Sequence, residues 1–324
     1  MKKTLKKVLA LALGTTMALS LASCGSSSKE GDTYNIGICQ LVQHDALDAA
    51  TKGFKDALKE KLGDKVKFDE QNAQGDSATC ATIVNSFVSA KVDLILANAT
   101  APLQAAANAT EDIPILGTSI TDYATALDFD DFTGSTGINV SGTCDLAPLD
   151  KQAEMLHELF PDAKKVGIIY CSAEPNSKFQ ADKITGYLKE YDITCTNYSF
   201  VDSNDISAVV NGAVQNSDVI YIPTDNTAAS NTGVIDSIAR PAGVPIIAGE
   251  QGICKGCGVA TLSISYYDIG YESGLMAYEI LVNGADIKTM DIKYAPKVVK
   301  QYNKEICEEL NVTIPDDYEA IETE

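Results

Sequence analysis

The 324-residue sequence contains no tryptophan, two histidines and one arginine, Arg240. Two histidines, His44 and His157, leave little material for a histidine-based metal site or a catalytic triad. A lone arginine cannot form a cluster that clamps phosphate groups. The motifs G-x-S-x-G, H-E-x-x-H, G-x-G-x-x-G and the P-loop are also missing from the sequence. These absences predict a protein that is not an enzyme and that uses no metal and no other cofactor.

Basic residues are scarce as a group. The sequence has 25 lysines and arginines against 45 aspartates and glutamates, which gives a formal net charge of −20. Nucleic acids are bound through basic surfaces, so this balance excludes DNA and RNA as expected partners. The same excess of negative charge disfavours electrostatic attachment to an anionic membrane surface.

The N-terminal segment is the exception to this acidic character. Four lysines within the first seven residues precede an apolar run from Val8 to Leu21, and Ala22-Ser23-Cys24 follows. A basic start, a short apolar stretch and small residues before a cleavage site are typical of a secretory signal. A cysteine directly after that site makes it a bacterial lipoprotein signal. The run is shorter than the roughly 20 residues that span a bilayer, and it lacks the polar face of a buried amphipathic helix.

We therefore expect residues 1–23 to be a signal peptide that is removed, which makes Cys24 the first residue of the mature chain. Cys24 would carry lipid such as palmitate, and residues 24–32 would form a Ser/Gly-rich tether. The protein is then expected outside the cytoplasm, anchored to the bacterial cell membrane. Removing the four lysines of the signal leaves 21 basic against 45 acidic residues, a net charge of −24.

Eight cysteines remain once Cys24 is assigned to lipid. An even number in an exported chain permits disulfides, but the sequence does not give their pairing. Cys254 and Cys257 form a C-x-x-C motif, for which we expect a local disulfide or plain thiols. Metal binding would need a second pair at suitable spacing, and redox chemistry would need a thioredoxin-like context. The eight are Cys39, Cys80, Cys144, Cys171, Cys195, Cys254, Cys257 and Cys307.

Apolar, strand-like runs alternate with amphipathic stretches along the chain. Residues 34–41 predict a strand, and apolar residues at three- and four-residue steps over 47–62 predict a helix. The same alternation restarts after Asp150, with strands predicted at 166–170, 194–200 and 219–222. Strands that alternate with helices indicate an α/β fold in which a parallel sheet is covered by helices on both faces.

The two halves of the chain resemble each other. Residues 91–115 and 216–246 each contain a strand, a Thr-containing turn, a helix and a strand that includes a proline. Chance similarity between two βαβ units is the alternative explanation. We predict two similar doubly wound parallel-sheet lobes, joined by a hinge near 139–146 and 260–265 and separated by a cleft. Hinged lobes of this kind are suited to capturing a small molecule.

Polar side chains follow the predicted strands at their carboxyl ends, where open α/β sheets bind ligands. Hydroxyls and helix N-termini suit a carboxylate, and an isolated acid such as Asp225 suits an ammonium group. Together they predict a site for a zwitterion such as an amino acid. Helix capping alone is the alternative role for residues of these types, although the adjacent pair Asp225-Asn226 exceeds what one cap needs. The candidates are Gln43, Asn72, Gln74, Thr100, Thr118 and Asp122 in the first half, and Ser172, Glu174, Asn176, Asp225, Asn226 and Glu250 in the second.

An ordered set of short stretches covers nearly the whole chain after residue 32. With these stretches the sequence resembles the substrate-binding lipoproteins of ABC importers, of the tryptophan/tyrosine-type group. No single stretch decides this resemblance; the ordered set carries it. The stretches are Gln43–Asp48, Gln71–Asp76, Val92–Ala97, Gln104–Thr110, Thr121-Asp122, Asn139–Thr143, Glu174–Ser177, Tyr221–Asn226 and Tyr266–Gly270.

The resemblance implies the type I periplasmic-binding fold, with three crossings between the lobes and an aromatic amino acid as ligand. On this basis we expect one lobe from 33–143 and 264–291, and the other from 144–263 and 292–324. Carried over by position, Thr100 and Thr118 would face the ligand carboxylate, and Asp225 and Asn226 would hold its ammonium group. Gln74, Asn176 and Glu250 would line the cleft.

The sequence departs from the family pattern in the first-lobe pocket wall. Thr100-Ala101-Pro102 replaces the usual Thr-Pro-Ala, and Thr121-Asp122-Tyr123 replaces Thr-Asp-Pro. Because tryptophan is absent, any aromatic wall must come from tyrosine or phenylalanine. The resemblance further implies a monomer that delivers its ligand to ABC permease subunits. Alternatives within the same fold are a branched or polar amino acid, a nucleoside or a small peptide as ligand, or a sensory receptor.

Overall fold

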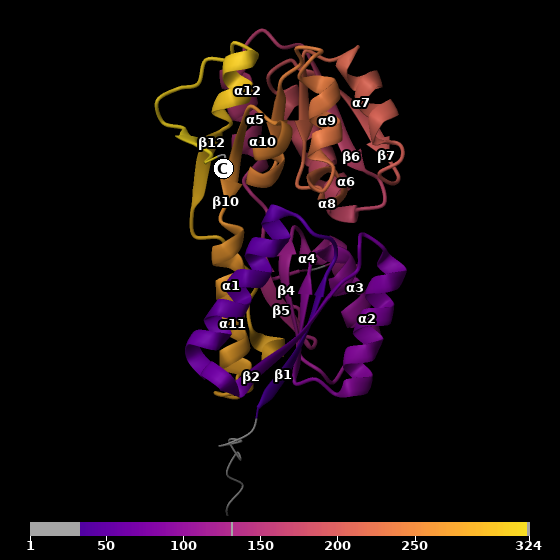
Figure 1. Ribbon diagram of the computed structural model, residues 1–324, viewed down its shortest axis with the longest axis vertical. Helices are drawn as coiled ribbons and strands as arrows, with labels where there is room; N and C mark the ends of the chain where they lie inside the picture. The colour runs from indigo at the N-terminus through magenta and orange to yellow at the C-terminus, as the bar shows by residue number, and fades with distance from the viewer. Residues whose placement is uncertain (1–32, 131, 323–324) are drawn as a thin grey trace, which may run out of the picture. The chain divides into compact units, whose positions relative to one another are not determined.

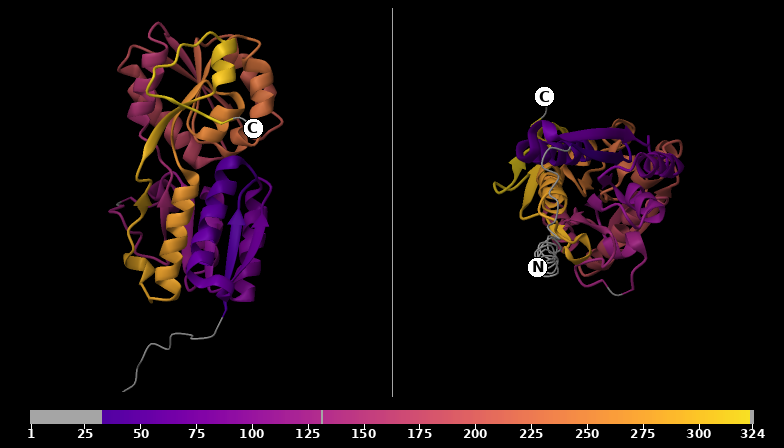
Figure 2. Two further views of the ribbon diagram at one scale, coloured as in Figure 1. Left: turned by 60° about the vertical axis from the view of Figure 1, so that its left-hand side comes forward. Right: turned by 90° about the horizontal axis from the view of Figure 1, so that it is seen from below.

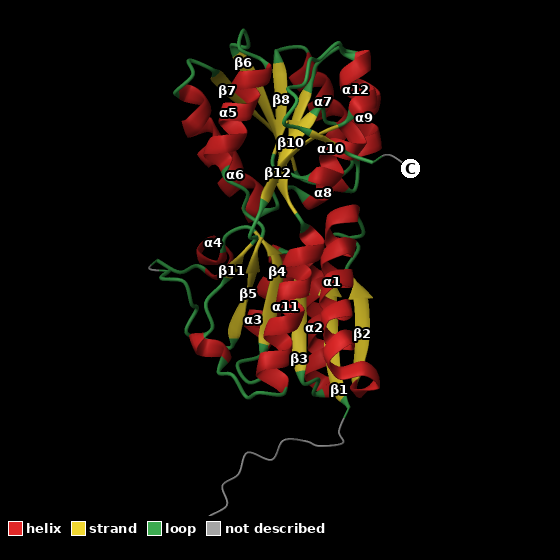
Figure 3. Cartoon of the chain, turned by 90° about the vertical axis from the view of Figure 1, so that its left-hand side faces the viewer, coloured by secondary structure: helices red, strands yellow, loops and turns green. Residues whose placement is uncertain are grey.

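A computed structural model describes residues 33–130 and 132–322. The expected signal peptide 1–23, Cys24 and the tether to residue 32 lie outside this range. From Thr33 onward the chain forms one compact unit, which contains two sheets, each flanked by helices (Figure 1, Figure 3).

The first sheet has six strands in the order β11-β5-β4-β3-β1-β2, and all of its strand pairs are parallel. Side chains of β1 alternate between two cores, as expected for a strand that is buried on both faces. Ile36 and Ile38 pack with helices α1 and α11, whereas Cys39 packs with α2 and α3. The strands are β1 Tyr34–Gln40, β2 Val66–Asn72, β3 Leu94–Asn98, β4 Ile115–Ile120, β5 Val140–Cys144 and β11 Lys293–Tyr294. The helices are α1 Asp45–Leu62, α2 Ser77–Ala90, α3 Thr100–Ala109, α4 Tyr123–Leu127 and α11 Tyr266–Leu281, with short 3-10 turns η1 Gly63–Lys65 and η2 Ile287–Thr289.

The second sheet has seven strands in the order β13-β12-β10-β9-β8-β6-β7, and only the β10–β12 pair is antiparallel among those described. One face packs on α5, α6 and α12, and the other on α7, α9 and α10. The strands are β6 Lys165–Cys171, β7 Thr194–Phe200, β8 Val219–Ile222, β9 Ile246–Ala248, β10 Ala260–Ile264, β12 Val298–Tyr302 and β13 Glu319–Ala320. The helices are α5 Leu149–Leu159, α6 Pro175–Lys189, α7 Ile206–Val214, α8 Asn226–Ala229, α9 Thr232–Ala239, α10 Gln251–Cys257 and α12 Lys304–Glu309.

These two sheets, each covered on both faces, confirm the predicted α/β class with two doubly wound lobes. The chain passes from one sheet to the other after β5, after β10 and after β11. The lobe boundaries expected from the sequence place residues from 292 onward in the second lobe. Lys293 and Tyr294 instead pair with β5. The first lobe therefore extends to Tyr294, and the third crossing follows that residue.

Helices α1 and α11 are packed backbone to backbone on the first sheet (Figure 1, Figure 2). A Cβ atom added at Gly270 would lie 2.0 Å from the carbonyl oxygen of Ala50, and one at Gly53 would lie 2.1 Å from that of Tyr267. No side chain fits at either position, so glycine is required for this close approach. Because α11 begins at the second crossing, this packing fixes the N-terminal end of α1 beside that crossing.

Candidate functional site

A small cavity lies at the carboxyl ends of strands from both sheets. Its lining combines the loop after β1, the end of β4, the first two crossings and the ends of β8 and β9. The two lobes also meet directly here, because His44 Nε2 lies 3.2 Å from Asn226 Oδ1. The lining residues are His44, Leu47, Ser119, Thr121, Asp145, Asn176, Thr224, Asp225, Asn226, Ala229, Glu250 and Tyr266.

Asp225 follows β8 and is 1% exposed. Its Oδ1 accepts a hydrogen bond from the amide of Ala228 at 2.8 Å, and its Oδ2 accepts one from the amide of Cys171 at 2.6 Å. Burial, reinforced by the nearby Glu174 carboxylate, raises the pKa of Asp225 to about 8. Two backbone amides therefore hold the Asp225 carboxylate in place, but its negative charge remains unfavourable in this buried position.

Two further carboxylates line the same cavity. Glu250 caps α10 by accepting from the amides of Gly252 and Ile253. Asp145 follows β5 at the first crossing and accepts from the hydroxyls of Thr121 and Tyr266, both at 2.9 Å. Burial raises the pKa of Glu250 and that of Asp145. Neither lysine nor arginine lines the cavity within the part of the chain that the structure describes. His44 is the basic residue in the lining, and it lowers the pKa of Asp145 and of Glu250 less than burial raises them. A cavity with three buried acids and a single histidine suits a cationic group.

Two buried polar atoms at this cavity lack a hydrogen-bond partner, namely His44 Nδ1 and Ser119 Oγ. Buried polar groups are nearly always satisfied, so each such exception calls for an explanation. Ser119 also has φ +57°, in the left-handed region that non-glycine residues seldom adopt. Strained backbone and an unpaired hydroxyl at a cleft are typical of a binding site whose ligand supplies the missing partner.

A second, larger cavity of about 340 Å³ adjoins the first. Asn176 and Asn226 line both cavities. Thr100 and Ala101, at the start of α3, line the larger one, and this ten-residue helix has no side-chain N-cap. Uncapped amides at a helix N-terminus favour an anion. The two cavities together therefore offer an acidic end and an end that suits a carboxylate.

Glu174 acts mainly on its own lobe. Its Oε2 accepts from the backbone amide of Asn226 at 3.0 Å and from the Asn226 side chain at 2.7 Å. Its Oε1 accepts from the amide and the hydroxyl of Thr227 at 2.9 and 2.7 Å. The bond from the Asn226 amide group orients that side chain between the two cavities, and the other three hold Glu174 against the first turn of α8. Glu174 therefore positions a neighbour of the ligand site.

The structure brings seven of the sequence candidates to the two cavities and places the other five elsewhere. Asp225, Glu250, Asn176 and Asn226 line the smaller cavity; Gln74, Thr100 and Glu174 line the larger one. Thr118 is fully buried and accepts from the hydroxyl of Thr143 at 3.2 Å.

Of the remaining four candidates, three have local structural roles and one lies at the surface. Asn72 accepts from the amide of Gln74, Asp122 caps α4, and the hydroxyl of Ser172 donates to the carbonyl of Phe200. Gln43 borders a separate surface depression beside His44 and Lys255. Capping, the alternative raised for these residue types, describes Asp122, whereas Asn72 stabilises the turn that follows β2.

Six polar residues of the smaller cavity were not among the candidates: His44, Ser119, Thr121, Asp145, Thr224 and Tyr266. Asp145 and Tyr266 stand on the first and second crossings, where the lobes meet. An acidic residue within a segment expected to cross between the lobes, 139–146, is the signal that singles out Asp145. Ser119 and Thr121 are adjacent in sequence to the candidates Thr118 and Asp122.

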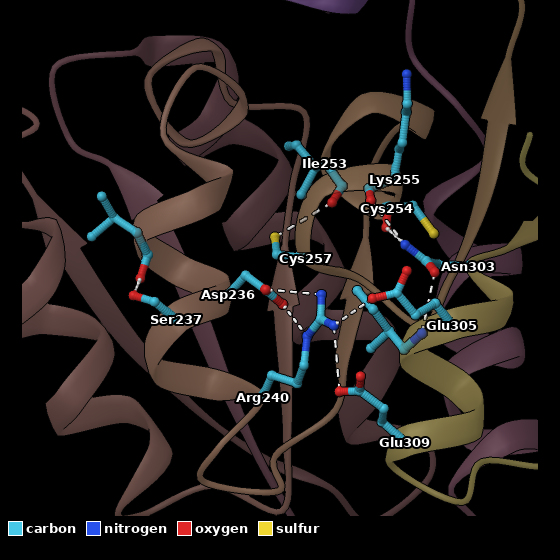
Figure 4. A network of polar contacts seen from close by, with 12 residues as sticks. Asp236, Ser237, Arg240, Ile253, Cys254, Lys255, Cys257, Asn303, Glu305 and Glu309 are labelled. Carbon is cyan, nitrogen blue, oxygen red and sulfur yellow. Dashed lines mark hydrogen bonds and ion pairs between the residues drawn. The ribbon is translucent and has the colours of Figure 1, made fainter. Parts of the chain in front are cut away.

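The C-x-x-C motif lies in α10 and contributes to packing. Cys254 and Cys257 are buried, and their sulfurs point to different sides of the helix (Figure 4). Cys257 Sγ donates to the carbonyl of Ile253 at 3.4 Å, and Cys254 Sγ to that of Gly258 at 3.8 Å. Of the expected alternatives, plain thiols are the ones observed. No group of three potential metal-ligating side chains is found among residues 33–130 and 132–322.

Two α/β lobes with three crossings, and a polar cleft at the strand ends, define a solute-binding protein of the type I periplasmic-binding fold. Residues 35–323 match the family described as ABC transporter substrate binding protein, and the chain belongs to this family. Its members bind solutes rather than catalyse reactions, and they work outside the cytoplasm. In the described part of the chain, we find no helix with the length and apolar character needed to cross a membrane.

Relatives agree with this assignment. The chain is 38% identical over 305 residues to the "Tyrosine-binding protein" of Clostridioides difficile, covering 90% of this chain and 88% of that protein. A leucine binding protein of Thermotoga maritima, at 16% identity and a TM-score of 0.61, shares the fold.

Two solved structures differ in ligand state. The ABC domain of Streptococcus pneumoniae in complex with L-Trp has 31% identity and a TM-score of 0.84, covering 88% of this chain and 97% of that one. A ligand-free, open substrate binding protein with adhesive properties from Clostridium difficile has 36% identity but a TM-score of only 0.69, covering 90% and 100%. The present structure is thus closer in shape to the ligand-bound relative, although its sequence is closer to the open one.

Proposed function

We propose that this protein is an extracytoplasmic lipoprotein that captures an aromatic amino acid and delivers it, as a monomer, to an ABC permease. The similarity to a tyrosine-binding protein and to an L-Trp complex supports the ligand class. The lysine-rich start, the apolar run and Cys24 support cleavage after residue 23 and lipid attachment.

The observation that carries the proposal is the acidic cavity with its two unpaired polar atoms. The ligand ammonium group would sit among Asp225, Glu250 and Asp145, where it supplies the charge that these buried acids lack. Ser119 Oγ would accept from the same group. The ligand carboxylate would face the first turn of α3 at Thr100. This arrangement would bind both charged groups of a zwitterion.

The larger cavity provides the space for the ligand side chain. Its volume of about 340 Å³ falls within the range typical of small-molecule sites. Apolar contacts are available from Leu41, Val42, Ala101, Pro175 and Val201. No tyrosine or phenylalanine lines this cavity among the described residues, so the expected aromatic wall is replaced by aliphatic contacts.

Binding and closure follow from the same contacts. A ligand that touches both lobes stabilises the closed arrangement because it binds that arrangement more tightly than the open one. The ammonium site takes Asp225 and Glu250 from the second lobe and Ser119 from the first. The permease would then recognise the closed form, which exists mainly when ligand is present.

A thermal-shift panel of the twenty amino acids, nucleosides and simple sugars tests this function. A ligand at about 100 times its Kd adds roughly 2.7 kcal/mol to stability, which is a shift of several degrees for a protein of this size. We expect shifts with tyrosine, tryptophan or phenylalanine. A shift with only a sugar or nucleoside would contradict the proposed ligand class and leave the solute-binding role intact.

A further inference from the structure

The two ring nitrogens of His44 have different surroundings. His44 stands at the N-cap of α1, in the loop after β1, and its side chain makes no capping hydrogen bond. Its Nε2 lies 3.2 Å from Oδ1 of Asn226, a residue of the second lobe. Its Nδ1 is buried at the smaller cavity and has no hydrogen-bond partner among the described residues. One nitrogen therefore holds the ring in place, and the other is available to a ligand.

The contact with Asn226 decides which nitrogen of His44 carries the proton. The amide nitrogen of Asn226 donates to Glu174 Oε2 at 2.7 Å, because a carboxylate can only accept. The amide oxygen of Asn226 therefore faces His44 and requires a donor there, which is the N–H group at Nε2. A neutral ring protonated at Nε2 has a lone pair at Nδ1. A doubly protonated ring would instead bury an N–H group at Nδ1 where no acceptor lies within hydrogen-bond distance.

The smaller cavity has room for one group of about the size of a water molecule. Its volume is about 10 Å³, which is close to the minimum that a single water needs. A primary ammonium group is of similar size and has three N–H donors. Three kinds of acceptor surround the cavity, namely His44 Nδ1, Ser119 Oγ and a buried carboxylate such as that of Asp225. The number of donors therefore matches the acceptors that are available.

We propose that His44 Nδ1 accepts a hydrogen bond from the ligand ammonium group, and that the site thereby selects primary ammonium groups over N-alkylated ones. The inference rests on the ammonium position given in the proposed function, and it adds a binding residue and a selectivity. An N-methyl group replaces one of the three donors with carbon, which leaves one buried acceptor unpaired. The same methyl group exceeds the space of the smaller cavity. Proline and N-methylated amino acids are therefore excluded as ligands.

His157, the other histidine, provides the contrast. Its Nδ1 is also buried without a partner among the described residues. Its ring, however, stacks on that of Tyr191 with centroids 4.5 Å apart, and His157 lines neither of the two cavities. An unpaired ring nitrogen alone therefore does not mark a ligand contact. At His44 the nitrogen also faces a cavity that contains buried acids.

Isothermal titration of the full chain with L-tyrosine and with N-methyl-L-tyrosine tests the selectivity. We expect the N-methyl compound to bind about 10-fold more weakly or worse, which is the usual effect of losing a hydrogen bond to a charged group. His44→Gln places its amide near the position of Nε2, so it should weaken tyrosine binding and narrow the preference. His44→Asn can place its amide oxygen near the position of Nδ1 and should keep the preference. His157→Asn, the matched control, should bind both compounds as the unchanged protein does.

Nitrogen-15 NMR of the histidine rings tests the proton position without altering His44. The chain has two histidines, so His157→Asn assigns the signals. We expect His44 to carry its proton on Nε2 alone, and the Nδ1 resonance to shift when L-tyrosine is added.

Three results would each overturn the proposal: equal affinity for the two tyrosines, an Nδ1 that carries a proton in the complex, or a His44→Gln variant that keeps the full preference. The first two need no variant of His44, so a misfolded variant does not decide the matter. Equal affinity would leave the proposed function intact, because tyrosine would still bind. If no amino acid of the panel bound, the proposed function would fail together with this inference.

Discussion

At the residue scale, Asp225 is the side chain on which ligand binding should depend most. Asp225→Asn removes the charge that faces the ligand ammonium group. Removing one partner of a buried charge pair costs on the order of 2–4 kcal/mol, so we expect affinity to fall by about 30-fold or more. Isothermal titration with tyrosine or tryptophan measures this loss.

Asp122→Asn is the matched control for this substitution. Both aspartates cap a short helix, Asp225 capping α8 and Asp122 capping α4, but only Asp225 lines a cavity. The control should therefore bind nearly as tightly as the unchanged protein. Equal losses in the two variants would mean that capping, and not contact with the ligand, explains the effect.

The buried Asp225 carboxyl also predicts how the ligand-free protein responds to pH. Its folded pKa of about 8 lies above the unfolded value near 3.9, so protonation favours the folded state. The stabilisation is fully present below about pH 4 and is lost as pH rises through 8. Between pH 5 and pH 9 the unchanged protein should lose stability relative to Asp225→Asn. Urea unfolding at several pH values measures this difference, and a pH-independent difference would contradict it.

Some of these site residues could be predicted from the sequence, and others could not. Asp225 and Glu250 follow apolar strands, and strand polarity alone predicts that such residues gather at one edge of a sheet. Asp145 and Tyr266 come from different crossings, separated by more than a hundred residues, and their hydrogen bond exists only once both lobes are assembled. A pattern read along one segment does not contain that information.

At the element scale, the packing of α1 on α11 should depend on the absence of a side chain at Gly270. Gly270→Ala places a Cβ atom against the carbonyl of Ala50, and backbone atoms cannot yield as the end of a side chain can. Overpacking of this kind typically costs 1–3 kcal/mol. We expect a Tm lower by several degrees in a thermal melt.

Gly186→Ala is the matched control within a helix. An added Cβ atom at Gly186, in α6, meets nothing within 4 Å. Alanine there should leave stability unchanged or raise it by about 0.4–1 kcal/mol, because it restricts the unfolded chain. If Gly270→Ala proved as stable as this control, the close approach of α1 and α11 would be disproved.

The order of strands and helices was largely predictable at this scale, because hydrophobic periodicity over long segments reports burial directly. The short strand β11 was not, and the third crossing was expected before it. Lys293 and Tyr294 are exposed and pair with β5 through their backbone alone. Two exposed residues carry no periodic pattern, so only the folded sheet assigns them to the first lobe.

At the scale of the whole molecule, a strongly acidic chain carries a site that prefers a cation. The acids at the cavity are buried and have His44 as their one basic neighbour in the lining, whereas Arg240 and several lysines form ion pairs elsewhere, as Figure 4 shows for Arg240. The two-lobed class was predictable from the internal similarity of the halves. The shape of the cleft was not, because it depends on how the two lobes meet.

The most direct test compares L-tyrosine with 3-(4-hydroxyphenyl)propionate, which keeps the ring and the carboxylate but lacks the amino group. Isothermal titration measures both affinities on the same protein. We predict clear binding of tyrosine and a loss of at least 30-fold for the analogue, since without an ammonium group it gives the three buried acids no positively charged partner. Equal affinity for the two compounds would contradict the claim that this cavity recognises an amino acid through its ammonium group.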